Sequence, residues 1–100
     1  MSVYVQMNVE VRISGIHGRG VFALHDMPEG YYIGNYEGPP GGPGYSKFDF
    51  EVDGEMRRGR NDLRYMNSSS EANCEFDGFD CFTTQDIKAG EELTFDYTWE

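Results

Sequence analysis

Apolar and polar residues alternate in several short stretches of this chain. Apolar side chains occupy nearly every odd position of residues 3–13, and Leu93, Phe95 and Tyr97 alternate with polar residues near the end of the sequence. A period of two is typical of a β-strand with one buried face. We therefore predict a strand near each end of the chain. The pattern leaves open whether residues 91–99 form an edge strand, as terminal strands often do, or a more central one.

Turn signals divide the middle of the chain. Asp53-Gly54 follows the alternating residues 48–52, and this dipeptide is a strong signal for a tight hairpin. Residues 38–44 consist almost entirely of Gly and Pro, which predicts a flexible or polyproline-like loop. Residues 57–66 hold four Arg and are the stretch where we expect one short helical turn. We treat residues 38–62 as a short Gly/Pro-rich insert.

A second hairpin is predicted around Asp77-Gly78, which lies between two strand-like segments. If Asp77-Gly78 is the whole loop, the facing pairs are Phe76 with Phe79, Glu75 with Asp80, and Cys74 with Cys81. The directly opposed carboxylates of Glu75 and Asp80 would repel each other, so the face that carries them should be solvated or should meet a cation.

Two segments of the chain resemble each other. Residues 26–36 and residues 86–97 both begin with Asp, have Gly four positions later, and continue into a strand that ends in Tyr, with one extra residue in the second segment. We interpret this as an internal quasi-repeat that could bring Tyr36 and Tyr97 to comparable places. A chance resemblance of two turns is the alternative.

The composition indicates a single small domain over residues 1–100. With 13 Gly, 4 Pro and 15% aromatic residues, the chain is suited to short strands and tight turns rather than to a helical bundle. No apolar run approaches the roughly 20 residues that span a bilayer, and the start of the chain lacks an export signal. We therefore expect an intracellular protein without a membrane partner. The two cysteines form neither a disulfide framework nor a zinc site, so we expect both to be reduced and no metal to be bound.

The charge of the chain bears on its partners. The formal net charge is −10, and residues 51–100 carry 13 acidic and 5 basic groups, a net charge of −8. This balance excludes the basic footprint of a protein that binds nucleic acid directly. A cationic partner, such as a Lys- or Arg-rich protein tail, would be attracted to such a surface. Ordinary solubilising charge explains the same numbers equally well.

Gly18 and Gly20 stand one residue apart between strand-like segments. Glycine there permits positive φ and close approach of a ligand to the backbone. A dinucleotide fingerprint would need a third glycine and a following helix, whereas Val21-Phe22 continues as a strand. Taken alone, this pair of glycines indicates a plain turn more often than a ligand loop.

Four separated segments of the chain are notable together: Gly15–Ala23, Asn35–Gly38, Leu63–Cys74 and Gly90–Tyr97. Taken in this order, they resemble the SET-domain family of protein-lysine methyltransferases over about residues 9–100. The resemblance implies a mostly β fold, β-clip-like, of several short sheets in which the C-terminal strand is threaded through the loop that contains Asn67. S-adenosylmethionine would bind on one face, and a substrate lysine from a basic protein segment would enter a narrow channel from the other.

The resemblance also implies roles for individual residues. Tyr36 and Tyr97 would line the lysine channel as catalytic residues. Phe95 falls where the family's choice of Phe or Tyr limits the number of methyl groups, and Phe suggests room for di- or trimethylation. Trp99 could stack on the cofactor's adenine, although packing against the core explains it equally well. The other implied cofactor-binding residues are Gly18, Arg19, Gly20, Arg64, Asn67 and Ser68.

Elementary chemistry agrees with these roles. A lysine ammonium, with an ordinary pKa of about 10.4, is not a nucleophile, so its site must be desolvated to favour the neutral amine. Aromatic walls would provide that environment and would tolerate the methylated, cationic product. Alignment of the amine with the sulfonium methyl would supply much of the rate, without a metal or a covalent nucleophile.

The sequence departs from the family pattern at three places. Residues 67–70 read Asn-Ser-Ser-Ser where the family usually has Asn-His-Ser-Cys. We expect no counterpart of the Cys-rich zinc module that often follows the family's final strand. The short segment of residues 38–62 would leave the substrate groove loose or completed by a second subunit, and Tyr45 is a further candidate site residue from this segment. The lost His motivates an alternative function, a catalytically weak or inactive SET-like module that recruits protein partners.

Overall fold

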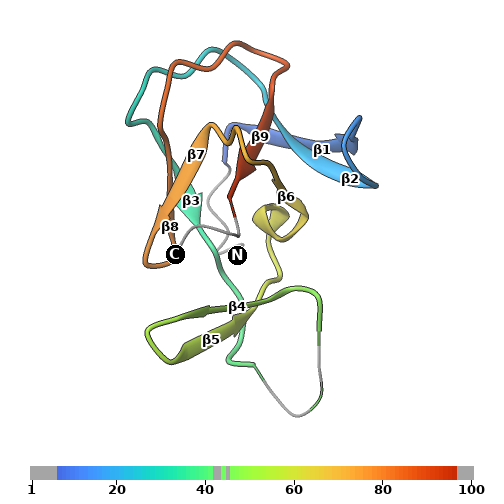
Figure 1. The fold of residues 1–100 in the computed structure, drawn as a ribbon, viewed down its shortest axis with the longest axis vertical. Helices are drawn as coiled ribbons and strands as arrows, with labels where there is room; N and C mark the ends of the chain where they lie inside the picture. The colour runs from blue at the N-terminus through green and yellow to red at the C-terminus, as the bar shows by residue number, and fades with distance from the viewer. Residues whose placement is uncertain (1–6, 42–43, 45, 97–100) are drawn as a thin grey trace, which may run out of the picture.

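The computed structural model describes residues 7–41, 44 and 46–96 of the chain. Short strands dominate this part, and the single helix in it is one turn of 3₁₀ helix, so the fold is mostly β as predicted (Figure 1). No helix in the described residues is long and apolar enough to cross a membrane. The elements are β1 (Val9–Ile13), β2 (Arg19–Ala23), β3 (Tyr32–Asn35), β4 (Asp49–Val52), β5 (Glu55–Arg58), η1 (Asp62–Tyr65), β6 (Asn67–Ser68), β7 (Cys74–Asp77), β8 (Asp80–Thr83) and β9 (Glu92–Phe95).

The final described strand, β9, lies inside a sheet and not at its edge. The strand order is β1-β2-β9-β6, and β9 is antiparallel to β2 and parallel to β6. Leu93 is fully buried and Phe95 is 7% exposed, so the apolar positions of this strand fill the core. The alternative of a terminal edge strand is therefore wrong, because β9 is hydrogen-bonded to a strand on each side.

The segment between β6 and β7 encloses β9 on the side away from β2. The backbone N–H of Ser69 donates to the carbonyl of Phe95 at 3.1 Å. Further along, the Asn73 side chain donates to the carbonyl of Glu92 and accepts from the N–H of Thr94, both at 2.9 Å. β9 thus runs between β2 and residues 67–73, in keeping with the threaded arrangement that the sequence predicted.

The two quasi-repeated turns lie against each other. Met27 and Ile87 form an antiparallel bridge, with two backbone hydrogen bonds of 2.9 and 2.8 Å. Asp86 accepts a hydrogen bond from the N–H of Glu29 in the other turn at 2.9 Å. Asp26 reciprocates by accepting from the N–H of Ala89, also at 2.9 Å. Each Asp therefore stabilises the turn of the other copy, which makes chance resemblance a poor explanation.

The second sheet has the order β3-β8-β7, and its hairpin corrects the predicted register. The loop consists of Gly78-Phe79, not Asp77-Gly78. Phe79 is only 8% exposed, and its burial shifts the turn by one residue. The observed pairs are Asp77 with Asp80, Phe76 with Cys81, Glu75 with Phe82, and Cys74 with Thr83.

The middle of the chain contains the predicted hairpin of β4 and β5, with Asp53 (φ 51°) and Gly54 (φ 85°) in the tight turn. Two other expectations need correction. Residues 39–41 are not a free loop, because they form backbone hydrogen bonds with the edge of β5. The helical turn is confined to η1, whereas Arg57 and Arg58 belong to β5.

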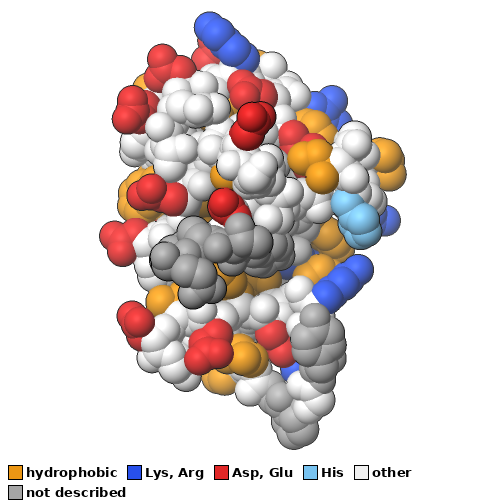
Figure 2. All heavy atoms as spheres, viewed as in Figure 1, with side chains coloured by type: hydrophobic (Ala, Val, Ile, Leu, Met, Phe, Trp, Pro, Cys, Tyr) orange, Lys and Arg blue, Asp and Glu red, His pale blue; other side chains and the backbone are white. Residues whose placement is uncertain are grey.

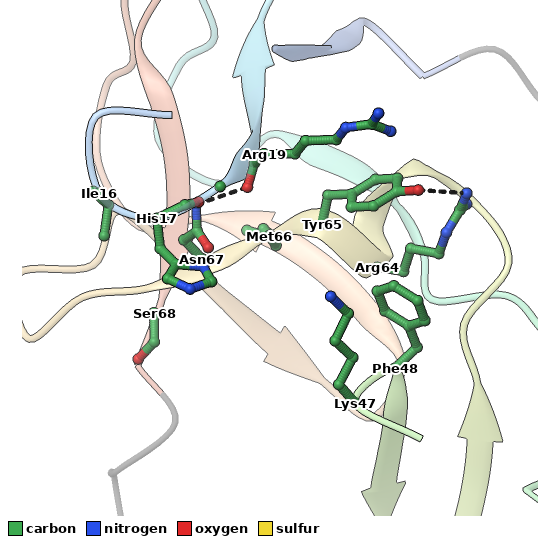
Figure 3. Close-up of a pocket in the computed structure, with 11 residues that line it drawn as sticks. Ile16, His17, Arg19, Lys47, Phe48, Arg64, Tyr65, Met66, Asn67 and Ser68 are labelled. Carbon is green, nitrogen blue, oxygen red and sulfur yellow. Dashed lines mark hydrogen bonds between the residues drawn. The ribbon is translucent and has the colours of Figure 1, made fainter. Parts of the chain in front are cut away.

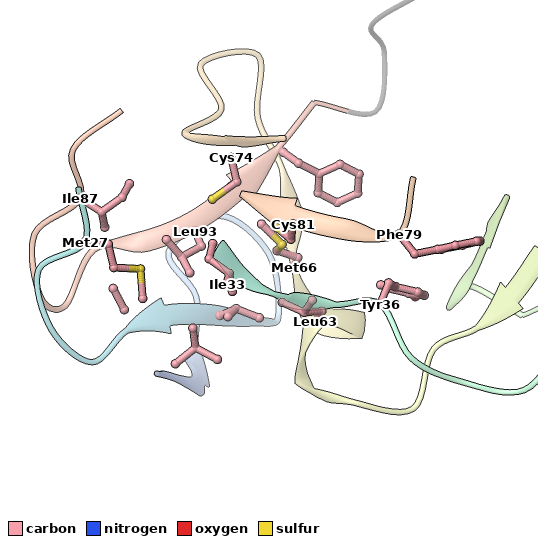
Figure 4. Packing of buried hydrophobic residues seen from close by; sticks show 14 residues of the cluster. Met27, Ile33, Tyr36, Leu63, Met66, Cys74, Phe79, Cys81, Ile87 and Leu93 are labelled. Carbon is pink, nitrogen blue, oxygen red and sulfur yellow. The ribbon is translucent and has the colours of Figure 1, made fainter. Parts of the chain in front are cut away.

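The core lies between the first two sheets and extends toward the β4–β5 hairpin (Figure 4). Cys74 and Cys81 are both buried free thiols. A hydrogen bond between their side chains, together with burial, raises the pKa of Cys81 well above its ordinary value. The largest fully buried side chains are Met27, Leu63, Ile87, Leu93 and Val21.

Candidate active site

A cavity of about 690 Å³ opens between the β1–β2 turn and η1 (Figure 3). We call it the inner cavity. Its lining includes three cations, Arg19, Lys47 and Arg64, and no Asp or Glu among the described residues. This is unusual for a chain with a net charge of −10. The lining residues are Ile16, His17, Gly18, Arg19, Lys47, Phe48, Arg64, Tyr65, Met66, Asn67 and Ser68.

The inner cavity thus brings together five of the predicted cofactor-binding residues, Gly18, Arg19, Arg64, Asn67 and Ser68. Gly20, the sixth, does not line it. A Cβ at Gly20 would come within 2.2 Å of the Glu92 carboxylate, so this glycine leaves room for that carboxylate. Gly18 adopts φ 47°, the left-handed region, in the turn that leads into β2.

Glu92 and Ser14 are site residues that the sequence reasoning missed. The Ser14 hydroxyl donates to the Glu92 carboxylate, with O–O distances of 2.8 and 2.9 Å to its two oxygens. The same hydroxyl accepts from the N–H of Ile16 at 2.8 Å and so stabilises the β1–β2 turn. Since Glu92 lies 78 positions after Ser14 in the chain, no local pattern could have joined them.

Asn67 connects this turn to the centre of the sheet. Its side-chain amide donates to the backbone carbonyls of His17 and Arg19, each at 3.0 Å, and to Glu92 at 2.9 Å. Two amide hydrogens are therefore shared among three oxygens. Asn67 lines the inner cavity, and Glu92 and Ser14 hold Asn67 and the β1–β2 turn in place. We call these three residues the clasp.

Arg64 and two aromatic rings form the opposite wall. The Arg64 guanidinium donates to the carbonyl of Asn61 and to the hydroxyl of Tyr65, both at 2.9 Å. It also lies 4.4 Å from the centre of the Tyr65 ring and 5.8 Å from that of Phe48. These contacts hold Arg64 and the flat faces of Tyr65 and Phe48 at one side of the inner cavity.

Tyr36 and Phe95 line a much smaller space, which we call the narrow cavity, of about 20 Å³. Phe50 and Phe76 complete its aromatic wall, with ring centres 4.9 Å apart. Phe76 is 5.1 Å from Phe95, and Phe50 is 5.2 Å from Tyr36. The Tyr36 hydroxyl donates to the carbonyl of Phe48 at 2.5 Å. The two described members of the predicted lysine channel are therefore in one aromatic site.

The narrow cavity lies between the inner cavity and two outer ones. It shares Lys47, Arg64 and Met66 with the inner cavity. On its other side, Phe76 and Phe95 also line two outer cavities of about 290 and 340 Å³. Among the described residues, one carboxylate, Asp49, lines the narrow cavity, and none lines the inner cavity. The outer cavities are lined by four carboxylates, Glu51, Asp53, Glu75 and Asp96.

A polar chain holds the β4–β5 hairpin, which carries Phe50, against the second sheet. Arg57 donates to the Asn35 side chain at 2.6 Å, and Asn35 donates to Asp80 at 2.9 Å. Asp80 also accepts from the Tyr32 hydroxyl at 2.9 Å. The hydrogen bonds from Asn35 and Tyr32 hold the pKa of Asp80 below its ordinary value. Arg57, through its charge, acts in the same direction.

An ion pair stabilises the β4–β5 hairpin itself. Arg58 contacts Asp49 at 2.8 Å, and this hydrogen bond lowers the pKa of Asp49 below its ordinary value.

Figure 2 shows acidic side chains spread over one face of the molecule. No group of three or more His, Cys, Asp or Glu side chains that could hold a metal ion occurs in the described part of the chain. Tyr97, Trp99 and Tyr45 lie outside the described residues.

The family model of the SET domain matches residues 18–98, which include the inner-cavity residues from Gly18 onward and the narrow cavity. The chain belongs to the SET-domain family. SET domains are generally methyltransferases, and the family typically uses S-adenosylmethionine. A comparison with curated proteins found no match.

The residues of the inner cavity fit this cofactor. S-adenosylmethionine combines a flat adenine, a ribose and an amino acid tail with a carboxylate. Tyr65 and Phe48, whose rings are nearly perpendicular with centres 5.8 Å apart, offer aromatic surface to the adenine, and the cations suit the carboxylate. The volume also lies within the range of ligand pockets, roughly 300–1,000 Å³.

Proposed function

We propose that this SET domain is a protein-lysine N-methyltransferase that transfers methyl groups from S-adenosylmethionine to a lysine in a basic protein segment. The observation that carries this proposal is the series of cavities. A cationic inner cavity shares lining residues with a narrow aromatic cavity, which in turn shares Phe76 and Phe95 with outer cavities lined by carboxylates. Such a series separates a site for an anionic tail from a site for a basic chain.

The lining of the narrow cavity suits the side chain of lysine, but at about 20 Å³ the cavity holds only a water-sized group and must widen to admit one. Four of its nine lining residues are aromatic and two are the cations Lys47 and Arg64, so loss of hydration and repulsion by like charge both favour the neutral amine there. The same ring faces accept the methylated cation after transfer. The cofactor, when bound, supplies an electrophilic methyl group. Tyr36, Phe50, Phe76 and Phe95 restrict the amine to one line of approach, and Phe95 lacks a hydroxyl that would hold a water in the space needed for further methyl groups. We therefore propose di- or trimethylation.

The outer cavities favour a basic substrate. Glu51 and Asp53 lie beside one opening of the aromatic site, and Glu75 and Asp96 beside the other. Carboxylates placed there would attract a Lys- or Arg-rich segment and would speed its association at low ionic strength.

The test is transfer of a labelled methyl group from S-adenosylmethionine to a panel of basic proteins, followed by mass spectrometry of the product. Tyr97→Phe removes a hydroxyl from a predicted catalytic position and should lower the rate about 100-fold or more. Tyr31→Phe is the matched control, because its hydroxyl contacts only Asn8 among the described residues. No transfer to any protein, or equal transfer by wild type and Tyr97→Phe, would contradict the proposal.

An interaction module without catalysis is the second candidate. Two observations favour it, Ser68 in place of the family's usual His and the full engagement of the Asn67 amide within the protein. Calorimetry with S-adenosylhomocysteine separates the two candidates. Micromolar binding supports the enzyme, and absence of binding supports the module.

A further inference from the structure

Lys47 occupies the junction of the two central cavities. It lines both the inner cavity and the narrow cavity, and it is one of only two lysines in the chain, the other being Lys88. Figure 3 shows its side chain extending into the inner cavity beside Phe48 and Tyr65. Its ammonium lies 5.3 Å from the centre of the Phe48 ring. No role follows for Lys47 from the motifs in the sequence.

The cations and amides around this cavity differ in how far the protein already uses them. Arg64 donates to backbone carbonyls and to the Tyr65 hydroxyl. The Asn67 amide is shared among three protein oxygens. Lys47, in contrast, has no hydrogen bond or ion pair with any other described residue, and the nearby Asp49 is paired with Arg58. Arg19 likewise has no side-chain hydrogen bond or ion pair with a described residue, but it does not line the narrow cavity. Lys47 is therefore the cation at the junction of the two cavities that is available to a ligand.

The charge of the ligand determines where such a cation is useful. A sulfonium is positively charged and would be repelled by an ammonium, whereas a carboxylate would be attracted to it. We propose that the Lys47 ammonium binds the carboxylate of S-adenosylmethionine and of S-adenosylhomocysteine. This inference rests on the proposed function, and it gives Lys47 a role in cofactor recognition that no motif in the sequence assigns.

The contact also restricts the orientation of the cofactor. Lys47 stands at the boundary with the narrow cavity, while Tyr65 and Phe48 offer their faces in the inner cavity. A carboxylate held by Lys47 leaves the adenine to the aromatic wall. The amino acid tail is then anchored beside the aromatic channel, and Lys47 acts as a binding residue whose own amine is occupied.

Calorimetry with a matched pair of ligands tests this assignment. The first ligand is S-adenosylhomocysteine, and the second is its decarboxylated form, S-adenosyl-3-thiopropylamine, which keeps the amine and the adenosine. Lys47→Met retains an unbranched side chain without the charge, and Lys88→Met is the control for loss of a lysine. At low salt we expect Lys47→Met to weaken S-adenosylhomocysteine by about two- to fivefold, the range of a partly exposed charge pair. Its affinity for the decarboxylated ligand should equal that of the wild type.

Two further measurements make the outcome decisive. Lys47→Arg should retain most of the affinity, and the loss in Lys47→Met should shrink as salt is raised. If Lys47→Met lost affinity equally for both ligands, or for neither, the assignment of Lys47 would be overturned. Methyl transfer by the wild type would still support the proposed function in that case. Methylation of Lys47 itself, found by mass spectrometry without added substrate, would also overturn it, since the amine would then lie at the methyl end. A wild type that binds neither ligand and transfers no methyl group would contradict the proposed function as well.

Discussion

The two copies of the quasi-repeat have the same scaffold and carry different chemistry. Residues 20–35, the first copy, correspond to residues 80–95, the second copy, at a constant offset of 60 positions. Each copy is a strand, a turn and a second strand. β2 of the first copy pairs with β9 of the second, and β8 of the second pairs with β3 of the first. Met27 and Ile87, equivalent positions, are both 1% exposed and form a bridge with each other.

The site is found where the copies differ. Gly20 corresponds to Asp80, and only the glycine makes room for the Glu92 carboxylate. Glu92 in turn corresponds to Tyr32, which is half exposed at the surface. Phe95, in the narrow cavity, corresponds to Asn35, a polar link to the hairpin. Repeated residues therefore maintain the fold, and residues that break the repeat build the cavities.

The largest effect should come from removing equivalent core side chains. Leu93 is fully buried and Ile33 is 5% exposed, so Leu93→Ala and Ile33→Ala should each lower the free energy of unfolding by about 2–5 kcal/mol. We expect the larger loss for Leu93, because β9 has a paired strand on both sides. Urea denaturation of the two variants measures this. A loss below about 1 kcal/mol for Leu93→Ala would show that the strand is not central to the fold.

The turns should respond alike to a smaller change. Gly30 and Gly90 have φ values of 82° and 88°, and a Cβ at either would meet no atom within 4 Å. Alanine at each position should therefore cost about 1–2 kcal/mol through backbone strain alone. Urea denaturation measures the free energy of unfolding of the two variants. Unequal losses of this free energy would show that the two turns do not contribute equally to stability.

The clasp should distinguish site from scaffold. A glutamine at position 92 keeps one oxygen and directs an amide group at either Ser14 or Asn67, and Asn67 presents its donating Nδ2 group to this position. Glu92→Gln should therefore weaken S-adenosylhomocysteine by about fivefold, as measured by calorimetry, with faster hydrogen exchange at the N–H of Ile16. Tyr32→Phe, at the equivalent position of the first copy, should leave the affinity unchanged.

The sequence predicted features that depend on neighbouring residues better than features that depend on distant ones. The Asp53-Gly54 hairpin was predicted correctly because both residues must adopt positive φ. The Asp77-Gly78 register was wrong because burial of Phe79, whose ring lies 4.0 Å from the Arg57 guanidinium, selects a different loop.

The candidate site shows the same limit. The motif order predicted five of the eleven residues that line the inner cavity, but the partners of the Glu92 carboxylate come from β6 and from the turn after β1. A side chain that bonds across two strands leaves no periodic signal in the sequence. Lys47 was missed for a similar reason, because its position in the lining depends on where the β4–β5 hairpin lies against η1.

The smallest effect concerns pH and the position where Asp80 replaces the glycine of the first copy. Since its folded-state pKa is lowered, the stabilisation from Asp80 is present above the ordinary value of 3.8 and is lost as pH falls through the lowered pKa. Asp80→Asn should therefore be less stable than the wild type at pH 7, and the difference in melting temperature should shrink toward pH 3.

Asp77→Asn is the matched control, because Asp77 is paired directly with Asp80 across the hairpin and is exposed. It should be neutral or slightly stabilising, since it removes a like charge. A difference between wild type and Asp80→Asn that stays constant with pH would show that the hydrogen bonds from Asn35 and Tyr32 do not depend on the carboxylate charge.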